Sequence, residues 1–133
     1  MTLYRFHGWF GISTDVTSPE GEDVEPAIAT IQAAVEALDW DNGEAQLRAF
    51  NGSYFLYMLG AGNRPRDFPA DVERLLDVVS SAAPGSYGLL YSWDDELAGV
   101  AGNMFQVQVM TRGLLTPHGD PFLSPVVPIL SDD

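Results

Sequence analysis

The chain contains no cysteine and no lysine, and only two of its 133 residues are histidines. Without cysteine it has no disulfide bonds, thiolate nucleophiles or cysteine-ligated zinc or iron–sulfur sites. Without lysine it has no phosphate-binding loop of the GxxxxGK[ST] type. His7 and His118 have no partner at metal-ligand spacing, so we expect no metal site. No motif in the sequence indicates a catalytic residue or a cofactor site, and we expect neither.

Long apolar runs are also missing. No uninterrupted stretch of about 18 apolar residues occurs, and the first eight residues lack the basic start and apolar core of an export signal. We therefore expect a cytoplasmic protein without a membrane anchor.

Positive charge is scarce. The chain has six arginines and 19 acidic residues, which gives a formal net charge of −13. A field of this sign repels nucleic acid and anionic membranes and attracts basic surfaces. The charge predicts a positively charged protein partner, with no nucleic-acid and no membrane partner. Acidity for the sake of solubility alone would give the same composition.

The residues that are present indicate a folded chain. Hydrophobic residues make up 46% and aromatic residues 11%, which is too much for a chain that buries no core. A length of 133 residues fits one domain, and we assign 1–133 to it.

Hydrophobic periodicity predicts helices over 24–38 and 68–79 and strands over 4–12, 46–50, 53–59, 86–93 and 103–112, with a short strand at 114–116. Asn51-Gly52 predicts a tight hairpin turn. The strand that follows this turn is apolar on both faces, so we expect it to be covered on both sides. Gly88 lies inside a strand and should allow a neighbouring backbone or ring to approach closely. In 103–112 we expect Phe105, Val107 and Val109 inward and the glutamines outward.

The main elements follow the order β-α-β-β-α-β-β, with a proline-rich tail. Helices between strands in this pattern favour an α+β fold, in which a largely antiparallel sheet packs with two helices. A ferredoxin-like topology with added strands fits, because each β-α-β unit prefers a right-handed crossover.

Asp94-Asp95-Glu96 places three acids in a row where the strand over 86–93 is expected to give way to a loop. It lacks the alternating acids, central glycine and terminal glutamate of a calcium loop. Adjacent residues at a strand end also point apart, unlike catalytic carboxylates that flank a substrate. The group is therefore a solvated strand exit or part of a partner contact.

Several short motifs extend over nearly the whole chain, and the longest are nine and six residues long. They are His7-Gly8-Trp9, Asn51-Gly52-Ser53-Tyr54, Ala83-Pro84-Gly85-Ser86-Tyr87-Gly88-Leu89-Leu90-Tyr91, Asp94-Asp95, Asn103-x-Phe105-x-Val107, Arg112-Gly113-x-Leu115 and Asp120-Pro121-Phe122-Leu123-Ser124-Pro125. Together these motifs resemble the immunity protein 7 family of bacterial polymorphic toxin systems.

The resemblance implies a cytoplasmic α+β protein, not an enzyme, that binds and neutralises a cognate toxin domain. We expect a basic, nucleic-acid-targeting toxin whose active site is occluded. Acids at strand exits are the expected contacts: Asp94, Asp95 and Glu96, with Asp41, Glu44 and Asp120 nearby, and with Trp93 and Phe122 as apolar anchors.

Two other functions remain open from the residues alone. One is an acidic regulatory or scaffold protein. The other is a small enzyme or ligand-binding domain that uses the aromatic strand Tyr87-Leu89-Tyr91-Trp93. A deep pocket with a perturbed carboxylate would favour the latter.

Overall fold

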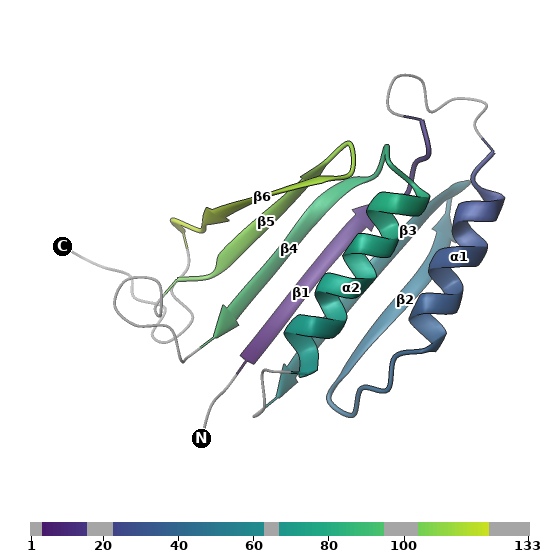
Figure 1. The fold of residues 1–133 in the computed structure, drawn as a ribbon. Helices are drawn as coiled ribbons and strands as arrows, with labels where there is room; N and C mark the ends of the chain where they lie inside the picture. The colour runs from purple at the N-terminus through teal and green to yellow at the C-terminus, as the bar shows by residue number, and fades with distance from the viewer. Residues whose placement is uncertain (1–3, 16–22, 63–66, 95–103, 123–133) are drawn as a thin grey trace.

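The computed structural model describes residues 4–15, 23–62, 67–94 and 104–122, which form one six-stranded sheet with two helices (Figure 1). The α+β prediction is thereby confirmed. Most expected elements are present with shifted ends, and the last strand is longer than expected. The elements are β1 (Tyr4–Gly11), α1 (Glu25–Glu36), β2 (Gly43–Phe50), β3 (Ser53–Gly62), α2 (Asp67–Ala82), β4 (Tyr87–Asp94), β5 (Gln106–Thr111) and β6 (Leu114–Gly119).

The strand order is β2-β3-β1-β4-β5-β6, and every neighbouring pair is antiparallel. The crossover through α1 skips β3, and the crossover through α2 skips β1, which is the split β-α-β arrangement of ferredoxin-like folds. β5 and β6 extend this unit beyond β4. Pro117 is tolerated within β6 because β6 is an edge strand.

Both helices lie on the same face of the sheet, α1 beside β2 and α2 across the centre (Figure 1). α2 buries one stripe of side chains at helical spacing, and β1 and β3 supply the opposing residues. α1 begins where the Asp23 carboxylate accepts a hydrogen bond of 3.2 Å from the Glu25 backbone N–H. The centre of this core contains Phe6, Phe10, Ile31, Leu56, Met58, Val72, Leu75, Leu76, Val79 and Leu90.

Two glycine predictions are confirmed. Asn51 and Gly52 have φ values of 53° and 83°, as a type I′ hairpin requires. Gly88 lies opposite Phe10, and a Cβ added at Gly88 would come within 2.7 Å of the Phe10 Cα. The absence of a side chain at Gly88 therefore lets β4 pack closely against β1.

The expected coverage of β3 on both sides is wrong. The helices cover only one face, and on the other face Leu59 is 62% exposed while Phe55 and Tyr57 are half-buried. Apolar residues on both faces of a strand thus do not require two covering layers. We call the second face, which carries no helix in the described part of the chain, the helix-free face.

The prediction for β5 is correct for the burial of Phe105 and Val107 and wrong for the side of the sheet that carries the helices. Val107 is buried as expected, but it pairs with Tyr91 on the helix-free face. Gln108, expected outward, faces the helix side and lines a cavity of about 270 Å³ between α2 and the sheet. The residues of β5 alternate as predicted, but Val107 faces away from the helices and Gln108 faces toward α2. The reason is that β5 lies outside the central strands, which the helices cover.

Candidate partner-binding surface

The topology brings most of the sequence-predicted contact residues to one end of the sheet, which we call the acidic end. β2 begins there after Asp41, β4 finishes there at Asp94, and β6 finishes there just before Asp120. β2 and β4 are three strand positions apart, or about 14 Å at a spacing of ~4.8 Å. Asp95 and Glu96 lie outside the described residues.

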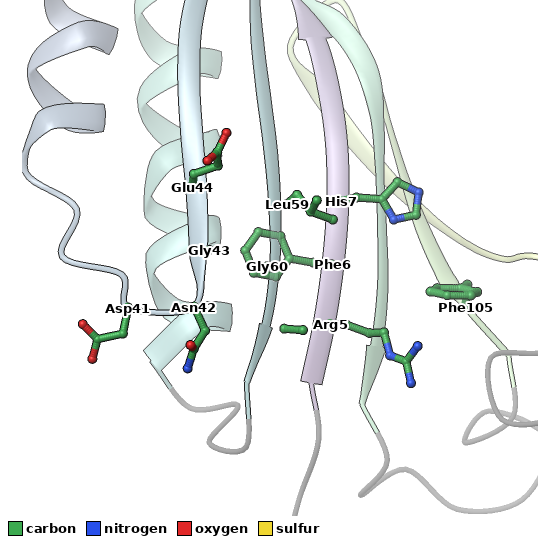
Figure 2. A pocket seen from close by; sticks show the side chains of 11 residues that line it. Arg5, Phe6, His7, Asp41, Asn42, Gly43, Glu44, Leu59, Gly60 and Phe105 are labelled. Atoms are coloured by element: carbon green, nitrogen blue, oxygen red, sulfur yellow. The ribbon is translucent and has the colours of Figure 1, made fainter.

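Asp41 and Glu44 are exposed and line an open cavity of about 710 Å³ (Figure 2). Glu44 pairs with Leu59, so its side chain belongs to the helix-free face. The Asn42 carbonyl accepts a hydrogen bond of 3.0 Å from the Ala61 backbone N–H, which fixes the start of β2 against β3. The backbone between the two carboxylates is therefore hydrogen-bonded to β3.

The opposite wall of this cavity contains a cation and aromatic rings. Arg5 lines it, and its guanidinium carbon lies 4.8 Å from the centre of the Trp93 ring. His7 points outward beside β4, with its ring 5.0 Å from that of Tyr91 and 6.2 Å from that of Phe105 (Figure 2). The cavity thus combines both signs of charge with apolar surface.

Two of the predicted contact residues are buried. Trp93 is only 6% exposed. Asp120 is 7% exposed, and its Oδ1 accepts a hydrogen bond of 3.2 Å from the Phe122 backbone N–H. The Asp120 backbone N–H donates to the Phe105 carbonyl at 2.8 Å. These two hydrogen bonds of Asp120 fix the chain just after the end of β6. Phe122, two residues later, is 90% exposed.

Asp94 is half-buried beside Tyr4, its partner on β1. Burial raises the pKa of the Tyr4 phenol, the hydrogen bond with Ser92 opposes this rise, and the Asp94 carboxylate adds to it. The Asp94 carboxylate therefore lies close enough to the Tyr4 phenol to affect its ionisation.

The remaining chemistry is sparse in the part of the chain that the structure describes. No three histidine, cysteine, aspartate or glutamate side chains gather there closely enough to hold a metal ion. Among those same residues, neither helix is long and apolar enough to cross a membrane. The aromatic side of β4, formed by Tyr87, Leu89, Tyr91 and Trp93, lines neither the 710 Å³ nor the 270 Å³ cavity.

Comparison with known families decides the class of the protein. The sequence model described as immunity protein 7 matches residues 3–132, nearly the whole chain. The chain belongs to the immunity protein 7 family. The resemblance inferred from the sequence motifs is thereby confirmed, and as an immunity protein the chain is expected to have a toxin as its partner.

The other comparisons add little to the family assignment. No curated protein matches the chain. Among solved structures, a phage SAM lyase in complex with S-methyl-5'-thioadenosine is similar with a TM-score of 0.35 and 10% sequence identity, covering 87% of this chain and 88% of the lyase chain. A likeness at that TM-score carries no argument about fold or function.

Several family motifs have structural roles in this fold. The Asn51-Gly52 motif forms the β2–β3 turn, and Gly88 allows the close approach of β4 to β1. Sequence reasoning did not name the exposed residues Trp9 and Leu59 as candidate contacts, and it named Tyr87 only for the alternative of a ligand-binding domain. For Leu59 the apolar residues on both faces of β3 were the available signal, but that pattern predicts burial.

Proposed function

We propose that this immunity protein binds a cognate toxin domain and blocks its active site, so that the cell carrying both proteins survives. The family match over residues 3–132 is the observation that carries the proposal. The formal net charge of −13 supports a basic partner, because opposite net charges accelerate encounter between proteins.

We further propose that the toxin acts on nucleic acid and that the acidic end meets its basic substrate groove. Asp41 and Glu44 are accessible acids at this end. Asp95 and Glu96 continue the chain after β4, and Phe122 offers an exposed ring. The buried Trp93 and Asp120 act as supports for this surface.

Growth rescue tests the proposed function. The toxin domain encoded by the neighbouring gene is expressed with and without this chain, and growth is scored. We expect growth only when both are present, together with a stable complex of the two purified proteins, the toxin being catalytically inactivated. If growth is not restored and no complex forms, the proposal is wrong.

Charge reversal tests the role of the acidic end. Asp41→Lys with Glu44→Lys should weaken binding in titration calorimetry and flatten its salt dependence. The matched control is Glu73→Lys with Asp77→Lys on α2, which makes the same change in net charge at exposed sites elsewhere. Equal loss in both double variants would mean that only net charge matters, and the assignment of the acidic end would fail.

A further inference from the structure

The exposed large hydrophobic side chains are not scattered over the molecule. Six large hydrophobic side chains are exposed among the described residues, and strand pairing places five of them on the helix-free face. Scattered single residues are normal on protein surfaces, whereas a shared face is characteristic of an interaction site. The five are Trp9, Phe50, Leu59, Tyr87 and Leu114.

Strand register makes this face continuous across the sheet. Trp9 on β1 lies between Tyr57 on β3 and Leu89 on β4. At ~4.8 Å between strands and ~3.3 Å per residue, a six-stranded sheet of this kind has a face of at most roughly 24 by 25 Å, or about 600 Å², part of which is taken up by the buried Trp93 and Val107. That is close to the ~800 Å² that each partner contributes to a standard protein interface.

The rings on this face are held in place before any partner arrives. Tyr87 lies over Gly11, where a Cβ would collide with its ring. Its ring is edge-on to Trp9, with centroids 6.1 Å apart. Rings fixed on strands lose little conformational entropy when a partner binds, which favours affinity. Trp9, which is 44% exposed on the inner strand β1, has the properties of a binding hot spot.

Charge distribution favours a different protein over a second copy of the chain as the occupant. The six strands contain two acids and two arginines, whereas the two helices contain six acids and one arginine. Arg48 on the helix-free face lies 5.4 Å from the centre of the Phe50 ring. The face itself is nearly neutral, but two molecules with a net charge of −13 each repel one another on approach.

We propose that the helix-free face is where the toxin domain docks, with Trp9 as the central anchor and Leu59 and Tyr87 beside it. This inference rests on the proposed function. The partner it fits is a basic protein domain that presents an apolar patch, with arginine or lysine side chains around it to meet Glu44 and to stack on exposed rings.

Two variants test the face, and both change exposed or half-exposed side chains. Trp9→Ala removes the anchor, and Leu59→Arg places a charge at a site that is 62% exposed. The matched control is Ala33→Arg, which adds the same side chain at an exposed position on α1. Binding to the inactivated toxin domain is measured by titration calorimetry, and folding is checked by thermal unfolding of each variant.

We expect at least a tenfold loss of affinity for Trp9→Ala and for Leu59→Arg, with Ala33→Arg binding as the wild type does. If the wild type binds and both face variants bind equally well, the docking face is wrong while the proposed function stands. If the wild type itself shows no binding, both proposals are wrong. A free chain that sediments as a dimer, and that Leu59→Arg converts to a monomer, would identify a second copy as the occupant and overturn the inference.

Discussion

The two faces of the sheet differ in both charge and cover. The helix side is buried beneath α1 and α2 (Figure 1). These helices carry exposed acids such as Glu25, Glu36, Glu73 and Asp77. The helix-free face carries exposed rings and balanced charge. The acidic residues and the exposed apolar residues are therefore concentrated on different faces, which the composition of the sequence does not reveal. We propose that the acids of the helix layer attract a basic partner at long range and that the helix-free face supplies the contact area.

Adjacent residues on β1 provide the sharpest test of this division. Phe10 is fully buried toward the helices, and Trp9 is 44% exposed on the other face. We expect Phe10→Ala to lower the free energy of unfolding by about 3–5 kcal/mol through loss of burial and creation of a cavity. Trp9→Ala should cost less than half as much and should weaken toxin binding far more. Urea denaturation measures the free energy of unfolding, and calorimetry measures the affinity for the toxin domain. Equal destabilisation by the two substitutions would contradict the division between the faces.

One acid of the helix layer has a structural role. Asp71 accepts a hydrogen bond of 2.9 Å from the Trp40 indole and forms a 2.8 Å ion pair with Arg74. Because the indole bond is half-buried, Asp71→Ala should cost about 1–2 kcal/mol of folding stability. Asp71→Asn keeps an acceptor for the indole and should cost less. Identical losses for both variants in thermal unfolding would show that the charge, not the hydrogen bond, matters.

The exposed acids of α2 should act at a distance. Glu73→Lys with Asp77→Lys should slow association with a basic toxin domain several-fold at low salt and leave the dissociation rate unchanged. The effect should shrink above 0.3 M salt, where the Debye length falls well below 10 Å. Stopped-flow or surface-based kinetics separate the two rates. A faster dissociation would mean that the helix layer touches the toxin.

Tyr4 gives the smallest effect. Because its folded-state pKa is raised above the usual 10.0, its phenol is neutral in both states below that pH. Above it the unfolded chain ionises first, so the free energy of unfolding falls by at most ~1.4 kcal/mol per pH unit until the folded phenol also ionises. We expect Tyr4→Phe to show a shallower alkaline loss than the wild type in urea titrations from pH 9 to 11. Parallel curves would contradict the role of burial.

Local chemistry made most of the fold predictable. The Asn51-Gly52 turn, the helical spacing in α1 and α2, and the alternation in β1 each depend on neighbouring residues alone, and all are observed. The family motifs predicted the class of protein, which the match over residues 3–132 confirms.

The side of the sheet that each residue faces was harder to predict. Alternation divides β5 into two sets, but which set meets a helix depends on where the crossovers place α1 and α2. Trp93 and Phe122 are both aromatic residues near strand ends, yet one is 6% and the other 90% exposed. Residues from other parts of the fold determine how deeply each ring is buried, and the alternation of residues along a strand does not predict those neighbours.

Hydroxyl-radical footprinting of the complex tests the docking face most directly, because it reports the solvent access of individual side chains. The free chain and its complex with the inactivated toxin domain are labelled under the same conditions and compared by mass spectrometry. We predict that Trp9, Leu59 and Tyr87 lose labelling in the complex, while the outer side chains of α1 and α2 keep theirs. Protection of the helices, with Trp9 labelled at the same rate in both states, would contradict the account.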